Sequence, residues 1–305
     1  MKLHGIIPPL ITPLRGRDEL DITGLERLVE HILGGGVSGL FILGTTGEGT
    51  GLSYRLRREM IGRVCGQVNG RVPVLVSVTD TSFVESIELA RYAALKGAST
   101  VVVAPPYYLP EAQPELQEYL YHLLPELPLP LFLYNIPALT KVQFDMETLK
   151  RALDEPRIVG FKDSSGDLAY FKNVAEVARQ RPDWSLLAGA EETLLESLQL
   201  GGHGGVNGGA NIFPTLYVKF YDAFQAGDIA RAQELQKQIL RVGDSLYRIG
   251  KYSSSIIKGI KCALACCEIC DDFMTEPFHR FRAEEREIVK SRLMQLKAEL
   301  SKLNL

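Results

Sequence analysis

Short apolar runs alternate with helix-like segments through the first two-thirds of the chain. Each run is almost continuously apolar, which is typical of strands that are buried on both faces of a parallel sheet. The eight predicted strands are Ile6–Ile11, Gly39–Leu43, Val72–Val78, Thr100–Ala104, Leu129–Tyr134, Ile158–Phe161, Trp184–Ala188 and Gly204–Asn207.

The intervening segments carry helical periodicity and helix-boundary residues. One apolar face repeats through Leu25, Leu28, Val29 and Ile32, and a second through Ile87, Ala90, Ala94 and Leu95. Capping residues precede three predicted helices: Asp21 before Thr23–Leu33, Ser53 before a helix to Val68, and Thr81-Ser82 before Phe83–Lys96. Gly97 and Gly201 stand where helices are expected to end.

This alternation predicts an α/β fold in which a parallel sheet closes as a (β/α)8 TIM barrel. An open, doubly wound sheet is the alternative. The glycine-rich Gly201–Asn211 does not match the dinucleotide-binding fingerprint, and we interpret it as the last strand and its loop.

After Pro214 the chain is expected to be helical throughout. The expected segments are Phe213–Gln225, Ile229–Leu246, a helix near Ser254–Cys270 and Ala283–Leu303. We therefore predict a barrel over residues 1–226 and a C-terminal helical extension over residues 227–305, packed on the barrel.

Charge and hydropathy exclude several classes of protein. The 305 residues include 34 basic and 37 acidic side chains, which gives a formal net charge of −3, and 46% of the residues are hydrophobic. No basic footprint for nucleic acid or an anionic membrane is present. No apolar run reaches the roughly 18 residues of a membrane span, and the N-terminus MKLHGIIPPL lacks a signal-peptide pattern. We expect a cytosolic protein.

Four of the five cysteines crowd into one stretch, KCALACCEIC, as Cys262, Cys266, Cys267 and Cys270. A metal site built from C-x2-C usually has a second such pair farther along the chain, and none follows here. We favour buried packing cysteines over a metal site.

Lys162 is the leading candidate for chemistry. It ends the apolar run Ile158–Phe161 and precedes a polar turn, Asp163-Ser164-Ser165-Gly166-Asp167. A desolvated lysine loses its proton readily, which suits it to Schiff-base formation. The alternative is a strand-end lysine whose ammonium reaches solvent.

Polar groups also end three other predicted strands. These are Gly44-Thr45-Thr46-Gly47-Glu48, Pro105-Pro106-Tyr107-Tyr108 and Tyr134-Asn135-Ile136-Pro137. In a barrel the carboxyl ends of the strands form one active-site face. A lysine imine, a tyrosine relayed through a threonine, and a glycine-flanked turn that binds a carboxylate together suit a 2-oxo acid. This chemistry requires no metal and no other cofactor.

The motifs GTTGE, PYY, YNIPA and GFKDSSGD, in this order, resemble the pyruvate-dependent class I aldolase superfamily of N-acetylneuraminate lyase and dihydrodipicolinate synthase. The resemblance spans essentially the whole chain. It implies that Lys162 forms the imine, that Tyr134 and Thr45 relay protons, and that Thr46 and the backbone at Gly47 bind the pyruvate carboxylate. It also implies a homotetramer, a dimer of dimers in which Tyr108 reaches a neighbouring subunit's site.

Leu139 distinguishes the branches of this superfamily. The synthases carry an arginine two residues after the proline of this motif, whereas this chain has YNIPAL, which resembles the lyases. Gly189-Ala190-Glu191-Glu192 resembles the lyase stretch that binds a polyol, although Ala190 and Glu191 differ from its usual residues, and a charge pair at a helix start is the alternative. Ser164, which departs from the common lyase pattern, and Asn207 complete the expected substrate site.

We therefore predict a lyase that cleaves N-acetylneuraminate or a related 2-oxo-3-deoxy sugar acid to pyruvate and an aldehyde. The alternatives are 4-hydroxy-tetrahydrodipicolinate synthase, a 2-oxo acid dehydratase, and a non-catalytic barrel that senses 2-oxo acids.

Overall fold

The protein consists of two compact units, and each is described by itself. The structure, a computed structural model, describes residues 2–303. The first unit comprises Met1–Ile7, Ser38–Phe41 and Ile61–Asn207, and the second comprises Pro8–Val37, Ile42–Met60 and Gly208–Leu305.

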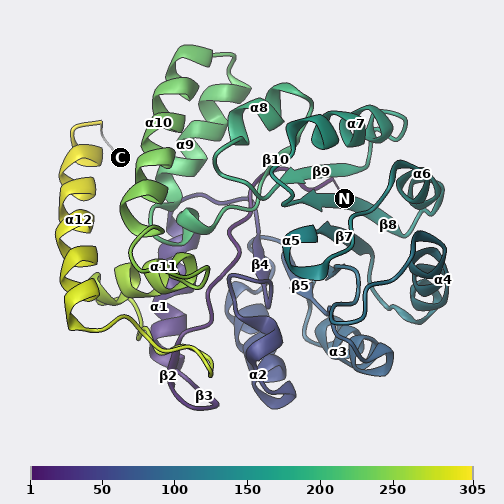
Figure 1. Cartoon of the computed structure of the whole chain (residues 1–305), viewed down its shortest axis with the longest axis horizontal. Coiled ribbons are helices and arrows are strands. Elements are labelled where there is room, and N and C mark those ends of the chain that lie inside the picture. Colours follow the sequence, from purple (N-terminus) through teal and green to yellow (C-terminus); the bar gives the residue numbers. More distant parts are fainter. Residues whose placement is uncertain (1, 304–305) are drawn as a thin grey trace. The chain divides into compact units, whose positions relative to one another are not determined.

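An eight-stranded sheet organises the first unit (Figure 1). Its strand order is β1-β10-β9-β8-β7-β6-β5-β4, and the paired strands are parallel. The Ser38 N–H donates to the Ile6 carbonyl over 2.8 Å, so the chain before β4 also bonds to β1. The strands are β1 Gly5–Ile6, β4 Leu40–Ile42, β5 Val74–Ser77, β6 Thr100–Val103, β7 Leu131–Asn135, β8 Ile158–Asp163, β9 Ser185–Ala188 and β10 Gly204–Gly205.

Helices follow the strands of the first unit and cover the sheet (Figure 1). They are α3 Phe83–Leu95, α4 Gln113–Leu123, η2 Leu124–Glu126, α5 Pro137–Thr140, α6 Met146–Asp154, α7 Leu168–Ala178 and α8 Leu194–Gln199. Side-chain caps begin three of them, because Ser82, Asp145 and Asp167 each accept a first-turn N–H. Helix α2, Tyr54–Val68, has residues in both units.

Apolar side chains from the strands fill the inside of the sheet. Leu75, Val102, Phe132 and Leu187 come from four different strands and are at most 2% exposed. This packing joins all four strands into one core. The predicted (β/α)8 fold is confirmed.

The second unit is mainly helical. Helix α1 spans Ile22–Gly34 and begins at the predicted cap, since the Asp21 carboxylate accepts the Gly24 N–H. The remaining elements are β2 Leu14–Gly16, β3 Glu19–Leu20, η1 Gly49–Gly51, η3 Gly208–Asn211, α9 Pro214–Gln225, α10 Ile229–Leu246, α11 Ser255–Cys266 and α12 Ala283–Ser301. The four expected C-terminal helices are therefore present.

Three local features differ from what the sequence predicted. The first strand ends at Ile6 and not at Ile11, because Pro8 and Pro9 have no N–H to donate to a ladder. The antiparallel pair β2–β3 was not predicted. Helix α11 stops at Cys266 and not at Cys270, and Glu268 just beyond it is left-handed, with φ of 59°.

Within residues 2–303, none of the helices combines the length and the apolar character needed to cross a bilayer.

Candidate active site

Lys162 and Tyr134 lie side by side on adjacent strands of the first unit. They are Cα partners in the parallel β7–β8 ladder, and each is 5% exposed. The Lys162 Nζ lies 3.9 Å from the centre of the Tyr134 ring and 4.9 Å from that of Phe41. The sequence did not point to Phe41, whose ring meets that of Tyr134 edge-on at 6.2 Å.

This surrounding lowers the pKa of Lys162. Burial removes water from the ammonium and is the largest cause, while the charge and hydrogen bond of Tyr134 and the charge of Asp163 act in the opposite direction. The neutral amine is therefore favoured more than in a solvent-exposed lysine. A neutral, rigidly held amine is the form that attacks a carbonyl carbon.

Asn135 and Asp163, the residues that follow Tyr134 and Lys162, form a second pair that joins the ends of β7 and β8. The Asn135 Nδ2 donates to Asp163 Oδ1 over 2.8 Å, and both side chains are buried. Asp163 also accepts the Ser165 N–H over 3.1 Å and the Ser165 hydroxyl over 2.8 Å. Burial is the largest cause raising the pKa of Asp163, and these hydrogen bonds oppose it. The sequence did not point to a role for this pair, although two polar residues at the ends of buried strands were a visible signal.

Three of the predicted substrate-binding residues, Ser164, Gly189 and Asn207, lie together beside this pair. The Gly189 N–H donates to the Asp163 carbonyl over 2.7 Å, and a Cβ at Gly189 would lie 1.9 Å from the Ser164 hydroxyl. Asn207 is fully buried and its Nδ2 donates to the Gly189 carbonyl over 3.4 Å. Gly189 therefore allows a close approach that a side chain would block.

Glu191 and Glu192 precede the short helix α8 and differ in exposure. Glu191 is 9% exposed, whereas Glu192 is open to solvent. The Leu194 N–H donates to the Glu191 carbonyl, so the pair forms the entry to the helix. Their contact with a substrate stays a prediction.

The Thr45–Gly47 loop belongs to the second unit and follows β4. The Glu48 N–H donates to the Thr45 carbonyl over 3.0 Å, and the Thr12 hydroxyl donates to the Gly47 carbonyl over 2.7 Å. Gly47 is buried, Thr46 is partly buried and Thr45 is exposed. The loop is thus a tight turn, held by a hydrogen bond of its own and by one from Thr12.

Two further predicted positions are exposed in the single chain. Tyr108 is 97% exposed and has a φ of 85°, and Leu139, in α5, is 55% exposed. Exposure of Tyr108 is compatible with a role at a subunit interface, which stays a prediction.

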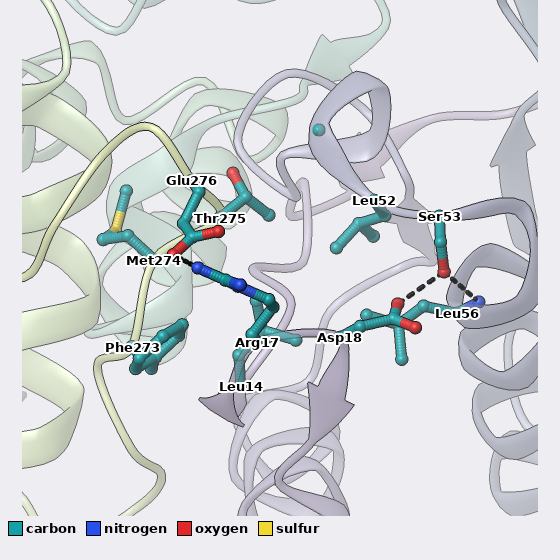
Figure 2. A pocket seen from close by; sticks show the side chains of 11 residues that line it. Leu14, Arg17, Asp18, Leu52, Ser53, Leu56, Phe273, Met274, Thr275 and Glu276 are labelled. Atoms are coloured by element: carbon teal, nitrogen blue, oxygen red, sulfur yellow. Dashed lines mark hydrogen bonds and ion pairs between the residues drawn. The ribbon is translucent and has the colours of Figure 1, made fainter.

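A separate pocket of about 240 Å³ lies within the second unit (Figure 2). It has an apolar lining that includes Leu52, Phe273 and Met274, and its rim carries the Arg17–Glu276 ion pair. No residue of the predicted site lines it, so we do not assign the chemistry to it.

The clustered cysteines are free thiols. Cys262 and Cys270 are buried, and burial raises the pKa of Cys270 to about 12. Among the described residues, no group of three or more His, Cys, Asp or Glu side chains is arranged to hold a metal ion.

Comparison with known proteins agrees with this geometry. Residues 2–296 match the dihydrodipicolinate synthetase family. The Escherichia coli protein named "Probable 2-dehydro-3-deoxy-D-pentonate aldolase YjhH" is 34% identical, over 84% of this chain and 86% of that protein. The 4-hydroxy-tetrahydrodipicolinate synthase of Methanopyrus kandleri is 32% identical, over 97% of both chains.

Solved structures give the same picture. The dihydrodipicolinate synthase of Bacteroides thetaiotaomicron superimposes with a TM-score of 0.94 at 51% identity, covering 96% of this chain and 98% of that one. YagE of Escherichia coli, determined in complex with pyruvate, superimposes with a TM-score of 0.90 at 29% identity, covering 96% and 98%. The chain belongs to the dihydrodipicolinate synthetase family, whose members are pyruvate-dependent lyases and synthases.

Proposed function

We propose that the protein is a class I aldolase that cleaves a 2-oxo-3-deoxy sugar acid to pyruvate and a hydroxyaldehyde. The observation that carries this proposal is the buried Lys162 amine, 3.9 Å from the centre of the Tyr134 ring, whose pKa is lowered by desolvation. Family membership supplies the pyruvate half of the chemistry.

The neutral Lys162 amine adds to the C2 carbonyl of the substrate. The Tyr134 hydroxyl gives its proton to the carbinolamine hydroxyl, which leaves as water, so that a protonated imine and a Tyr134 phenolate remain. The C3–C4 bond then breaks, its electron pair moves toward the imine, and the C4 hydroxyl gives its proton to the Tyr134 oxygen as the aldehyde leaves. Tyr134 gives this proton to C3 of the enamine. Hydrolysis of the protonated imine then releases pyruvate, and the proton set free returns to the Tyr134 oxygen. The imine is the electron sink, so these steps require no cofactor.

We assign the other predicted residues to proton relay, substrate binding and assembly. Thr45 relays the proton of Tyr134, and Thr46 with the Gly47 backbone binds the substrate carboxylate. Five residues contact the hydroxylated tail of the substrate: Ser164, Gly189, Glu191, Glu192 and Asn207. Tyr108 acts across an interface of a homotetramer.

Leu139 supports a sugar acid over aspartate semialdehyde. The aldehyde of the synthase reaction carries a carboxylate of its own, and leucine offers it no charge-assisted bond. Glu191 and Glu192 favour hydroxyl donors over an anion. The second candidate is 4-hydroxy-tetrahydrodipicolinate synthase, which the 51% identical structure favours by its name.

Trapping of the imine tests the mechanism. The protein is incubated with pyruvate and borohydride, and peptide mass mapping is expected to find one reduced pyruvyl group on Lys162. Lys162→Met provides the control without labelling. Absence of the adduct, or an adduct on another lysine, contradicts the proposal.

A side-by-side measurement of kcat/KM tests the substrate. Cleavage of 2-oxo-3-deoxy sugar acids, N-acetylneuraminate among them, is compared with condensation of pyruvate and aspartate semialdehyde. A charge-assisted bond contributes about 1.5–3 kcal/mol, so Leu139→Arg is expected to improve the semialdehyde reaction by about tenfold to a hundredfold. Efficient use of aspartate semialdehyde by the unmodified protein selects the second candidate.

The acidic residues are tested by a matched pair of variants. Glu192→Gln is expected to raise the KM for the sugar acid, whereas Glu196→Gln, an exposed glutamate inside α8, leaves it unchanged. Equal KM values for the two variants remove Glu192 from the substrate site.

A further inference from the structure

Glu48, the last residue of the GTTGE stretch, has a buried carboxylate with three hydrogen-bond donors. The Lys261 Nζ lies 2.6 Å from Glu48 Oε1, and the two side chains are 0% and 4% exposed. The Thr275 N–H and hydroxyl each donate to Glu48 Oε2 over 2.9 Å. Glu48, Lys261 and Thr275 are called the Glu48 lock below; all three belong to the second unit.

Stability alone does not account for the Glu48 lock. Removing both charges from water costs several kcal/mol per ion, so a buried ion pair is often no more stable than well-packed apolar side chains of the same volume. Such a pair instead fixes the relative positions of the chain segments that carry it, because each charge needs its partner at a fixed distance.

The loop held by the Glu48 lock has a backbone that needs support. Leu43 and Glu48, which flank Gly44–Gly47, are both left-handed, with φ of 60° and 54°. Non-glycine residues adopt this region at a cost of about 1–3 kcal/mol each when surrounding contacts hold them there. The chain is also crowded at Gly49, where a Cβ would lie 1.9 Å from the Leu43 carbonyl oxygen.

Thr275 belongs to an irregular segment beyond α11, residues 273–276, which is called the strap (Figure 2). Phe273 forms an isolated bridge with Leu14, and Met274 is 2% exposed. The ion pair between Arg17 and Glu276 on the outside has side chains that are 79% and 53% exposed, so it contributes little. The strap is therefore fixed mainly from its inner side, where Thr275 meets Glu48.

We propose that Glu48, Lys261 and Thr275 are positioning residues that hold Thr45–Gly47 in the conformation that binds the substrate carboxylate. This inference rests on the role assigned to that loop under the proposed function. Residues more than 200 positions away, on α11 and the strap, would thus act on catalysis without touching the substrate.

Two readouts on one set of variants test the proposal. The first is the pyruvate concentration that gives half-maximal borohydride labelling of Lys162, and the second is hydrogen–deuterium exchange of the amides of residues 43–49. Glu48→Gln is expected to raise the half-maximal concentration by about tenfold or more, since it removes one charge-assisted pair, and to speed the exchange. Labelling at saturating pyruvate is retained, because Lys162 is unchanged.

Glu276→Gln is the matched control. It makes the same chemical change to a glutamate of the strap that forms an exposed ion pair, and both readouts are expected to stay at the values of the unmodified protein. Thr275→Val keeps the buried ion pair and removes one hydroxyl; it is expected to change both readouts by several-fold and serves if Glu48→Gln does not fold.

The outcomes separate this proposal from the proposed function. If the unmodified protein is labelled and a folded Glu48→Gln or Thr275→Val variant needs no more pyruvate than Glu276→Gln, the positioning role is wrong. If the unmodified protein is not labelled, the proposed function fails, and hydrogen–deuterium exchange becomes the only test of whether these residues hold the loop. Faster exchange at residues 43–49 than in Glu276→Gln then supports the part of the proposal by which these residues hold the loop in place, and equal exchange overturns it.

Discussion

At the scale of single residues, the environment of Lys162 determines its chemistry. An exposed lysine is almost fully protonated near neutral pH and attacks carbonyls slowly, whereas desolvation lowers the pKa of Lys162. The aromatic faces of Phe41 and Tyr134 lie next to its amine, and burial is the largest cause of the lowered pKa. Burial of the Lys162 amine therefore lowers the free energy of unfolding at pH values where the unfolded chain carries a charged lysine.

We expect this cost to depend on pH. Between the lowered pKa of the folded state and the ordinary value of 10.5, the unfolded chain binds one more proton than the folded chain, so stability rises with pH across this window. Lys162→Met removes that dependence. Its gain in unfolding free energy should be largest at the low end of the window and should shrink as pH approaches 10.5.

Urea unfolding at pH 6 and pH 10 measures this gain for Lys162→Met. The control is Lys150→Met, at an exposed position of α6, whose difference from the unmodified protein should be the same at both pH values. A gain from Lys162→Met that does not change with pH would show that Lys162 is not desolvated.

Tyr134→Phe is expected to lower turnover by a factor on the order of 10²–10⁴, the usual contribution of general acid–base catalysis. The ring and its edge-on contact with Phe41 are kept, so the protein should fold. Tyr170→Phe is the matched control: its hydroxyl donates to the Phe144 carbonyl over 2.7 Å, and losing it should cost about 1 kcal/mol of stability without slowing the reaction. Turnover near wild type in Tyr134→Phe would assign the proton to another group.

At the scale of elements, the ends of β7 and β8 form a rigid unit. Tyr134 pairs with Lys162 in the ladder, and the next pair, Asn135 and Asp163, is joined by a side-chain hydrogen bond. The Asn135 Oδ1 also accepts the Phe144 N–H over 3.3 Å. The two candidate catalytic residues are therefore held by strands whose ends are tied together.

Asp163→Ala should remove the hydrogen bond between Asn135 and Asp163. It leaves the Asn135 amide donor buried without its partner, which costs about 1–3 kcal/mol, and it should lower kcat because Lys162 and Tyr134 are less firmly held. Thermal unfolding and steady-state kinetics measure both effects. Asp183→Ala, which removes an exposed carboxylate paired with Arg181, serves as the control and should leave kcat unchanged. A stable, fully active Asp163→Ala variant would show that this hydrogen bond does not help to hold Lys162 and Tyr134 in place.

The sequence predicted elements well where the pattern was local. Helix α10 has the expected bounds, and the Asp21 and Ser82 caps lie where they were predicted. The sequence did not predict the strands whose bounds depend on pairing with another strand. Pro8 and Pro9 stop β1 although the apolar run continues, and the short strands β2 and β3 have no apolar run of their own.

At the scale of the whole molecule, contacts between distant segments lie outside what the sequence could predict. Lys162 and Tyr134 were found because each lies at the end of an apolar run of the sequence. The partners of Glu48 lie 213 and 227 positions away, and no spacing rule connects them. The boundary near residue 226, the cytosolic location and the identity of the aldehyde stay predictions.

Assembly is the last prediction. Tyr108 and Leu109, in the loop after β6, are 97% and 79% exposed, and two large adjacent apolar side chains at such exposure are typical of a surface that another chain covers. We expect a homo-oligomer, most simply a tetramer, with an isologous contact through this loop. Light scattering should give a mass that is a multiple of the single chain, and Leu109→Asp should lower it, because burying a carboxylate in the contact is costly. Tyr121→Asp places the same charge on an exposed aromatic of α4 and should leave this contact intact. A monomer that turns over substrate at working concentration would rule out a contribution of Tyr108 to a neighbouring site.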